Sequence, residues 1–373
     1  MQAFILALGT RGDIELFLTL GCELVRRGHR VYFVAAELYE PRIREAGLFP
    51  VSLGAGTLEQ AQAVLRSLSS VPKEQRPGRF YEQWIAPQVP LAVQQIERFP
   101  GEIDFFICNM KLGLRRRGRI LPGAAVTYDP PDSLEELRRR RASEHAERLI
   151  EIVALPKALL DPNGVWDPKY HFTGFWDEPS FAGWEPPADL VRFVEAEPPP
   201  VVLTMGSMVT FDAKRLASTL FEALGRVGSR AVVVEGWSNF PRVDAFQDRL
   251  HIAKEVPYGW LFEKTSCVIH HGGTGTLAAV LRAGRPSILL PQLACQETFG
   301  EILIRENLAA DALDVETVDA DRLASALRRV HEDERLQQSA RAWQKLRKAE
   351  KGVVAAADLI EVHWEKLRQP PAR

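Results

Sequence analysis

Cysteine is scarce in this chain, and the few cysteines form no pattern. The 373 residues include four cysteines and no CxxC pair. Three of the four lie within apolar runs, which is typical of buried, reduced thiols and argues against a disulfide framework or a zinc site. We therefore expect a cytoplasmic protein.

Long hydrophobic runs and an excess of charge of one sign are also absent. No apolar segment approaches the ~20 residues that a membrane-spanning helix needs. The start, MQAFILALGTRGD, lacks the basic lead and long apolar run of a signal peptide. The 47 Lys and Arg residues nearly balance the 49 Asp and Glu residues, so the net charge of −2 gives no reason to expect nucleic acid as a partner.

Two arginine clusters interrupt this balance, Arg115–Arg117 and Arg138–Arg141. Charge runs usually form solvated surfaces, and glutamates surround the second cluster. The alternative is contact with an anionic membrane surface or an acidic partner. We expect the solvated surface and not the membrane contact.

The common phosphate-binding and metal-binding motifs are missing too. The chain has no GxxxxGK[ST] loop and no strand-linked GxGxxG, so neither a P-loop nor a dinucleotide-binding turn is indicated. The string DAD at 319–321 resembles the DxD of metal-dependent transferases, but it directly precedes a helical stretch and is better explained as a helix cap. The sequence therefore predicts no metal site.

What the chain does have is a regular alternation of short apolar runs and helical patterns. Residues 3–8 predict a buried strand, the spacing from Asp13 to Arg27 predicts a helix, and residues 30–36 predict a second strand. After a proline-rich stretch at 176–200 the pattern restarts. The length and this restart predict two doubly wound α/β domains, with a cleft between them as the default ligand site. Further strands are expected at 48–53, 103–109, 124–128, 201–207, 230–236, 251–256, 266–270 and 286–291.

The turn HHGGTGT, residues 270–276, follows one of these strands and opens a helix. Its three glycines allow a ligand to approach the backbone closely, and the helix end directs N–H groups and positive dipole into the turn. Such a turn binds anions, most often phosphate. Adjacent strand residues point to opposite faces, so we expect His271 to meet the ligand and His270 to be structural.

The residues of this turn belong to a longer stretch that resembles the signature of a known family. The stretch VPYGWLFEKTSCVIHHGGTGTLAAVLRAGRPSILLPQLACQETFG resembles the nucleotide-sugar signature of inverting enzymes of the UDP-glycosyltransferase superfamily, glycosyltransferase family 1. The match is closest to bacterial antibiotic and natural-product glycosyltransferases and to sterol glucosyltransferases. GTRGDIELFLTLGCELVRRGHRV, DPKYHFTGFW and VVLTMGSM match the same family in register along almost the whole chain.

The resemblance implies an α/β chain of GT-B fold, with two facing Rossmann-like domains, parallel sheets and an interdomain cleft. Residues 1–178 would bind the acceptor, 179–199 would be a linker and 200–351 would bind the nucleotide sugar. Residues 352–373 would form a C-terminal helix that packs back on the N-terminal domain.

The resemblance also implies the site residues. It places the donor diphosphate at Ser207, His271, Gly273, Thr274, Gly275 and Thr276. It places the nucleotide base at Val256 and Trp260, the latter alternatively a core residue, and the sugar at Cys295, Gln296 and Glu297. The glycine loop near the acceptor is Gly9, Thr10, Arg11 and Gly12. Alanines occupy the positions at which plant relatives bind the ribose with a carboxylate. The resemblance therefore does not distinguish between UDP and dTDP donors.

Asp13 matches the acceptor-activating aspartate of the antibiotic enzymes. An inverting transfer needs a base that removes the proton of the acceptor hydroxyl, and a carboxylate can serve. The structural alternative is that Asp13 is only a helix N-cap. The diphosphate site would stabilise the leaving group, so the resemblance implies no metal and no other cofactor.

Two departures from the family pattern concern the substrates. The family usually has an acidic residue before Gln296, and a thiol such as that of Cys295 cannot accept from two hydroxyls in its place. This favours a donor that lacks a hydroxyl there or a binding mode that uses Glu297, unless the site has lost selectivity or activity. The chain between Asn109 and residue 124 is shorter than in relatives, which suggests an open site for a large acceptor or a site completed by another subunit.

The predicted function is transfer of a sugar from UDP or dTDP to a hydroxyl of a hydrophobic natural product, by a monomer or a homodimer. A sterol or lipid glucosyltransferase at a membrane face is one alternative. A catalytically silent, nucleotide-sugar-binding auxiliary protein is the other.

Overall fold

A computed structural model of the chain describes residues 1–109, 115–116, 119–128, 148–160, 166–177, 184–209, 212–238, 240–241 and 249–368. The chain forms two compact units. Unit 1 contains Met1–Val64, Gly78–Pro179 and Glu350–Arg373, and unit 2 contains Leu65–Pro77 and Ser180–Ala349. The segment Leu65–Pro77, which the sequence analysis assigned to the first domain, thus belongs to unit 2.

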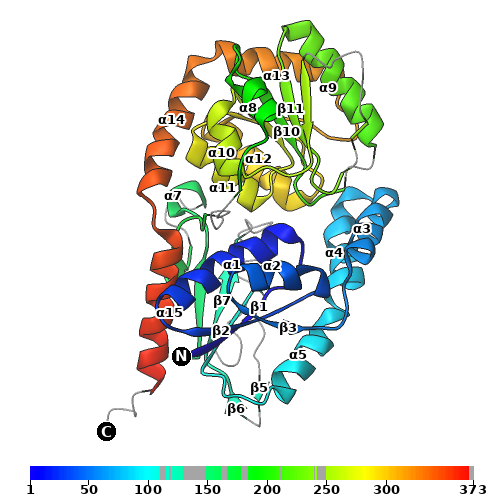
Figure 1. The fold of residues 1–373 in the computed structure, drawn as a ribbon. Helices are drawn as coiled ribbons and strands as arrows, with labels where there is room; N and C mark the ends of the chain where they lie inside the picture. The colour runs from blue at the N-terminus through cyan, green and yellow to red at the C-terminus, as the bar shows by residue number, and fades with distance from the viewer. Residues whose placement is uncertain are drawn as a thin grey trace. The chain divides into compact units, whose positions relative to one another are not determined.

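Unit 1 is built on a parallel sheet with the strand order β3-β2-β1-β4-β7-β8-β9. The strands are β1 (Gln2–Leu6), β2 (Arg30–Ala35), β3 (Phe49–Ser52), β4 (Phe105–Cys108), β7 (Gly123–Thr127), β8 (Leu149–Val153) and β9 (Tyr170–Phe172). The helices are α1 (Arg11–Arg26), α2 (Glu40–Glu45), α5 (Gln88–Arg98), α7 (Lys157–Leu160) and α15 (Gly352–Arg368), and α3 (Leu58–Ser67) and α4 (Arg76–Phe80) lead into and out of the unit 2 segment. Figure 1 labels these helices and the strands β1, β2, β3 and β7.

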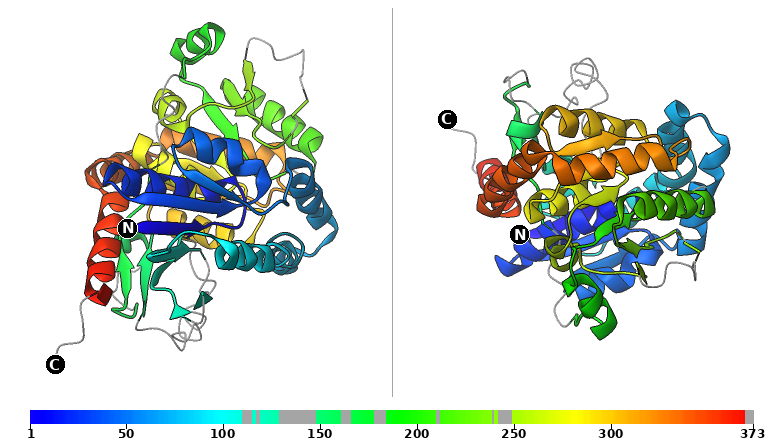
Figure 2. Two further views of the ribbon diagram at one scale, coloured as in Figure 1. Left: turned by 60° about the horizontal axis from the view of Figure 1, so that its bottom comes forward. Right: turned by 90° about the horizontal axis from the view of Figure 1, so that it is seen from above.

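Alternation along β1 explains why helices cover both faces of this sheet. Phe4 and Leu6 pack in one cluster with Ala92 and Ile96 of α5, whereas Ile5 faces α1 near Gly21. Successive strand residues point to opposite faces, so a strand that is apolar throughout requires cover on both sides. Figure 2 shows α1 and α5 with the strands of this sheet in a second view.

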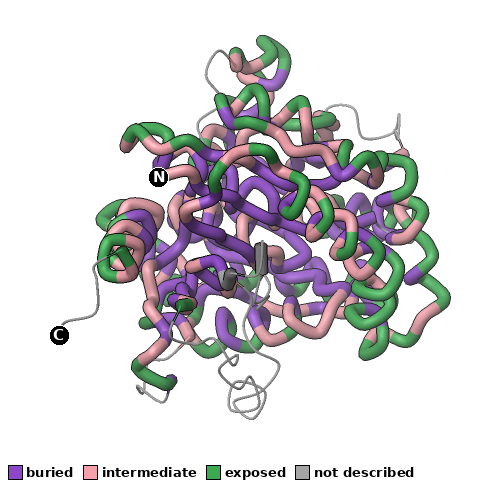
Figure 3. Tube along the Cα trace, turned by 90° about the horizontal axis from the view of Figure 1, so that it is seen from below, coloured by how far each residue is buried: buried purple, intermediate pink, exposed green. Residues whose placement is uncertain are grey.

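Unit 2 repeats the plan with the order β12-β11-β10-β13-β14-β15. The strands are β10 (Val201–Thr204), β11 (Ala231–Val234), β12 (Leu250–Ala253), β13 (Val268–His270), β14 (Ser287–Leu289) and β15 (Ala309–Ala312), and all pairs are parallel. The helices are α8 (Ala188–Glu195), α9 (Ala213–Val227), α10 (Tyr258–Leu261), α11 (Thr274–Ala283), α12 (Ala294–Arg305), α13 (Ala320–Glu332) and α14 (Glu334–Ala349). In Figure 3 the buried segments lie in the interior of the trace and the exposed ones mostly at its periphery. The predicted α/β fold with two parallel sheets is confirmed.

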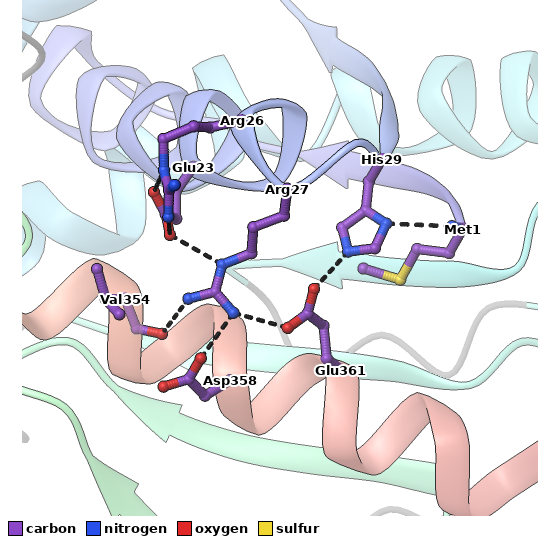
Figure 4. Close-up of polar contacts among 8 residues, drawn as sticks. All are labelled: Met1, Glu23, Arg26, Arg27, His29, Val354, Asp358 and Glu361. Atoms are coloured by element: carbon purple, nitrogen blue, oxygen red, sulfur yellow. Dashed lines mark hydrogen bonds and ion pairs between the residues drawn. The ribbon is translucent and has the colours of Figure 1, made fainter.

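The last helix, α15, belongs to unit 1 and packs along α1. Arg27 at the end of α1 donates to Asp358 and Glu361, both at 2.6 Å, and to the carbonyl of Val354 at 3.1 Å (Figure 4). His29 pairs with Glu361 at 2.6 Å. The attachment of α15 to α1 therefore depends on a charge network as well as on the packing of buried residues such as Ala356 and Ile360.

The structure describes the DAD string at 319–321 and part of the first arginine cluster. Asp319 caps α13 by accepting from the Arg322 N–H at 2.8 Å, which confirms the capping interpretation of the DAD string. Arg115 and Arg116 form the short strand β5, which pairs with β6 (Arg119–Ile120). Arg117 and the cluster at 138–141 lie outside the described residues. Within the described ranges no helix has the length and apolarity needed to cross a membrane.

Candidate active site

Both sheets change the direction of their strand order beside their first strand. In unit 2 the chain builds β11 and β12 on one side of β10 and β13 to β15 on the other. Ligands of such sheets bind beyond the carboxyl ends of the strands at this switch point. The loop with Ser207 follows β10 and the HHGGTGT turn follows β13, so unit 2 brings these two predicted segments together.

The imidazole of His271 lies between the two glycine loops. A Cβ on Gly273 would stand 2.3 Å from its Nε2, and a Cβ on Gly206 would stand 2.9 Å from its Cε1. Burial lowers the pKa of His271 to about 4, against a smaller opposing effect of the Thr204 backbone. At neutral pH the ring is therefore uncharged and can act as a hydrogen-bond donor to an anion.

His270 differs from its neighbour in having structural partners on both ring nitrogens. Its Nε2 contacts the Ser287 hydroxyl at 3.1 Å, and its Nδ1 accepts from the Gly272 N–H at 3.2 Å. The side chain is fully buried, which lowers its pKa to about 3. His270 thus stabilises the turn and presents no free nitrogen to a ligand.

The turn delivers the start of α11 to the same edge of the sheet. Gly272 has φ +94°, which only glycine adopts without strain, and Gly273 is the N-cap residue. The first backbone N–H groups of an α-helix have no partner within the helix and carry the positive end of its dipole. Thr274, Gly275 and Thr276 form the first turn of α11, so the predicted diphosphate residues occupy an anion-binding geometry.

The two residues predicted to meet the nucleotide base lie on one stretch. The side chain of Val256 is 4% exposed and packs in an apolar cluster of unit 2. Trp260 is half-buried, with its ring 5.4 Å from that of Trp184 and with the Lys264 ammonium 5.4 Å above it. Both residues thus have packing roles, and their contact with a base stays a prediction.

The three residues predicted to meet the sugar have different surroundings at the start of α12. Gln296 is buried, and its Oε1 accepts from the backbone N–H groups of Gln292 at 2.8 Å and Leu293 at 3.2 Å. Cys295 is half-exposed. The exposed Glu297 forms an ion pair of 2.5 Å with Lys73. Gln296 therefore has a capping role beside the predicted sugar contact.

Lys73 and Arg76 come from the segment Leu65–Pro77, and sequence reasoning missed both. Arg76 is 3% exposed, pairs with Glu316 at 2.5 Å and donates to the carbonyl of Gln292 at 3.5 Å. These partners are more than 200 positions away in the sequence, and no local pattern announces the pairing.

Gln292 is a further residue that the sequence did not single out. It is fully buried, yet both polar atoms of its side-chain amide have no hydrogen-bond partner within the described part of the chain. A buried polar group without a partner costs about 1–3 kcal/mol, so it is a natural candidate for a ligand contact.

In unit 1 the loop after β1 places Asp13 beside Gly9. A Cβ on Gly9, whose φ is +150°, would stand 2.2 Å from Asp13 Oδ2, so the loop requires glycine here. Thr10 donates to the same oxygen from its N–H at 2.5 Å and from its hydroxyl at 3.1 Å. Thr10 is the N-cap of α1 and Asp13 is the third residue inside the helix. The alternative of Asp13 as the N-cap was therefore wrong, because Thr10 takes that place.

The other carboxylate oxygen of Asp13 accepts from the hydroxyl of Tyr128. Asn109 donates to the same hydroxyl at 3.0 Å. Asn109 follows β4 and Tyr128 follows β7, which lie beside β1 in that order. The sequence analysis named neither partner, although parallel strands that end at one edge bring such residues together.

The carboxyl group of Asp13 is held in an environment that opposes its charge. Burial raises its pKa, and the hydrogen bonds from Tyr128 and Thr10 lower it by less. A carboxylate of raised pKa is a stronger base than an exposed aspartate, provided that it is ionised at the working pH. Among the described residues no group of three or more His, Cys, Asp or Glu side chains could hold a metal ion.

Comparison with known proteins gives a consistent result. Residues 3–100 match the glycosyltransferase family 28 N-terminal domain, and residues 218–352 match the erythromycin biosynthesis protein CIII-like C-terminal domain. The chain is 27% identical to O-mycaminosyltylonolide 6-deoxyallosyltransferase of Streptomyces fradiae over 425 residues, covering 99% of this chain and 98% of that one. It is 28% identical to sterol 3-beta-glucosyltransferase UGT80A2 of Arabidopsis thaliana, covering 99% of this chain and 66% of the longer relative.

Structural similarity supports the same assignment of the fold. The glycosyltransferase VinC, solved in complex with dTDP, has a TM-score of 0.64 at 17% identity and covers 98% of this chain and 100% of its own. The resemblance noted in the sequence is thereby confirmed. The chain belongs to the glycosyltransferases of GT-B fold that combine a family 28 type N-terminal domain with an erythromycin CIII-like C-terminal domain.

Proposed function

We propose that this glycosyltransferase moves a sugar from UDP or dTDP to a hydroxyl of a hydrophobic natural product, with inversion and without a metal ion. The relative of 98% coverage is named as an O-mycaminosyltylonolide 6-deoxyallosyltransferase, and the VinC structure contains dTDP. Unit 2 would bind the donor, and unit 1 would supply the base.

The observation that carries the proposal is the turn after β13. His271 is buried between two glycine loops, and the N-terminus of α11 lies beside it. In the transfer, negative charge develops on the diphosphate as the bond to the anomeric carbon breaks. A neutral imidazole donor and the helix N-terminus would stabilise that charge in the transition state, where it is largest.

Asp13 is the proposed base. In an inverting transfer the acceptor oxygen attacks the anomeric carbon as its proton leaves to a carboxylate within hydrogen-bond reach. Burial raises the pKa of Asp13, which strengthens it as a base. Gly9 lets the backbone approach this carboxylate closely.

The sugar end of the donor would be read by the start of α12. Cys295 replaces the usual acidic residue, and the remaining carboxylate nearby, that of Glu297, is ion-paired with Lys73. We therefore expect a donor that makes few hydrogen bonds at this point, such as a deoxysugar. The unpartnered amide of the buried Gln292 supports a polar contact close by.

A sterol acceptor is the second candidate, because a sterol 3-beta-glucosyltransferase is 28% identical over 99% of this chain. The two candidates differ in the acceptor and not in the donor chemistry. Binding to anionic liposomes that disappears when Arg115 and Arg116 are replaced by alanine would favour the sterol reading.

The test has two stages. Isothermal calorimetry measures the affinity of the protein for UDP and for dTDP. We expect one of the two to bind with a Kd in the micromolar range, and we expect no binding of NAD. Transfer from the matching sugar nucleotides to O-mycaminosyltylonolide and to a sterol is then assayed, and proton NMR determines the anomeric configuration of the product. Retention of configuration, or no affinity for either diphosphate, would refute the proposal.

A further inference from the structure

Asp13 is held through both carboxylate oxygens by groups from two chain segments, and a third segment orients one of these groups. Thr10, on the loop after β1, donates twice to Oδ2. Tyr128, after β7, donates to Oδ1. Asn109, after β4, donates to the Tyr128 oxygen at 3.0 Å and to the Leu8 carbonyl at 2.7 Å.

The direction of this hydrogen-bond chain follows from the chemistry of its members. The Leu8 N–H reaches Asn109 Oδ1 at 3.5 Å and the Leu8 carbonyl accepts from Nδ2, which fixes the orientation of the amide. The amide nitrogen can only donate and an ionised carboxylate can only accept. The phenol of Tyr128 must therefore accept from Asn109 and direct its own proton to Asp13.

The ring of Tyr128 is also fixed by packing. Phe17 of α1 meets it edge to face, with centroids 6.2 Å apart and planes at 82°. The same Phe17 ring meets Trp176 with the same separation and angle. Aromatic pairs of this geometry hold a ring in one orientation beyond their apolar burial. The hydroxyl thus reaches Asp13 from a preorganised position.

We propose that Tyr128, oriented by Asn109, is a positioning residue that fixes Asp13 Oδ1 and keeps this carboxylate ionised for removal of the acceptor's proton. The inference rests on the proposed function, in which Asp13 is the base. Tyr128 itself exchanges no proton with the substrate in this proposal. Its hydroxyl stabilises the charged form of the base, while Oδ2 is occupied by Thr10 in the same way.

The consequence is a specific change in the titration of Asp13. Burial raises the pKa of this carboxyl group, and the Tyr128 hydroxyl is the strongest of the hydrogen bonds that lower it. Removal of the hydroxyl should therefore raise the pKa further. A hydrogen bond to a charged group corresponds to a shift of about 1–2 pH units in the midpoint.

Other charged or titratable groups near Asp13 do not mimic this effect. Arg11 and Glu15 of α1 form an ion pair at 3.4 Å, and Arg42 of α2 pairs with Glu15 at 2.9 Å. Tyr39, which precedes α2, stays neutral because burial, followed by the charge of Asp13, raises its pKa well above the usual value. Tyr39 is buried, and its hydroxyl has no hydrogen-bond partner within the described residues. It is thus a matched control for the loss of a buried phenolic hydroxyl.

The test is a pH titration of Asp13 by carbon NMR in the full chain labelled with [4-13C]aspartate. The Asp13 signal is assigned by its loss in Asp13→Asn. We expect Tyr128→Phe to raise the midpoint by about one pH unit or more, Asn109→Ala to raise it by less, and Tyr39→Phe to leave it unchanged. An unchanged midpoint in Tyr128→Phe, or an equal shift in Tyr39→Phe, would overturn the proposal. If Tyr128→Phe does not fold, the Asn109→Ala titration decides, because it keeps the Tyr128 hydroxyl and removes the donor that orients it, together with the two Asn109 bonds to Leu8.

The proposed function fails in a different way. If Asp13→Asn still transfers sugar at the wild-type rate, Asp13 is not the base, whatever the titration shows. If Asp13→Asn is inactive and the midpoint in Tyr128→Phe is unchanged, the base assignment stands and the role of Tyr128 is refuted. Both are supported if the transfer rate falls as the pH is lowered through the NMR midpoint of Asp13, and if this fall shifts together with the midpoint in Tyr128→Phe.

Discussion

Replacement of Gly273 by alanine should damage diphosphate binding without unfolding the protein. The backbone at Gly273, with φ −66° and ψ 143°, suits any residue, so the effect comes from the added methyl group alone. That carbon would stand 2.3 Å from His271 Nε2, about 1 Å short of ordinary contact at 3.4 Å. The imidazole must therefore move, and it is buried beside Gly206 on its other side.

The size of the effect follows from the bond that is lost. A displacement of about 1 Å takes a hydrogen bond out of its favourable range. A hydrogen bond to a charged group contributes about 1.5–3 kcal/mol, which corresponds to about a 10-fold to 150-fold loss of affinity. We expect this increase in the Kd for UDP or dTDP, measured by isothermal calorimetry, with little change in Tm.

Gly225→Ala is the matched control for this substitution. Gly225 lies within α9 of the same unit, and a Cβ there meets no atom within 4 Å. We expect unchanged nucleotide affinity and equal or slightly higher stability, since alanine favours a helix over glycine. Wild-type affinity in Gly273→Ala would refute the placement of the diphosphate beside His271.

Four further predictions concern other parts of the molecule. Arg27→Ala should lower the free energy of unfolding by about 2–4 kcal/mol in chemical denaturation, because it removes four hydrogen bonds, three of them to the docked α15. Arg26→Ala should have a much smaller effect, because the side chain of Arg26 is 68% exposed. The hydrogen bonds from Arg26 and Arg27 lower the pKa of Glu23 to about 2, so the contribution of Glu23 is complete above its unfolded pKa and should be lost as the pH falls from about 5 to 2. Cys295→Asp should shift donor preference in competition assays toward a fully hydroxylated hexose, and an unchanged preference contradicts the assignment of this position to the sugar. EDTA at millimolar concentration should leave the transfer rate unchanged, and a loss that Mg²⁺ or Mn²⁺ restores would show that a metal takes part.

The fold could be predicted from the sequence because its signals are local. Apolar runs such as 3–8 and 201–207 are too continuous for exposed strands, and the helical spacing after Asp13 identifies the element that covers them. The restart of the pattern after the proline-rich stretch indicated two units. The strand, glycine turn and helix around 270–276 were equally predictable, because three glycines stand between an apolar run and a helical pattern. The binding of an anion by this turn stays a prediction.

The rest of the candidate site depends on contacts between distant segments. Asn109 and Tyr128 reach Asp13 because β4 and β7 end at the same sheet edge as β1, and only the strand order reveals this. Lys73 and Arg76 meet α12 and its preceding loop because Leu65–Pro77 packs in unit 2, which composition does not show. Asp13 was considered as an N-cap because it precedes a helical pattern and aspartate is among the most favoured N-cap residues. The helix begins earlier than this pattern, and Thr10 is its N-cap.

The measurement that tests the central claim most directly is a comparison of Asp13→Asn with the wild type in sugar transfer and in nucleotide binding. The substitution keeps the size of the side chain and removes its basicity. We predict a fall of at least about 100-fold in the transfer rate with an unchanged Kd for UDP or dTDP, since the proposed base belongs to unit 1 and the residues proposed to bind the diphosphate belong to unit 2. A variant that transfers sugar at the wild-type rate would contradict the account.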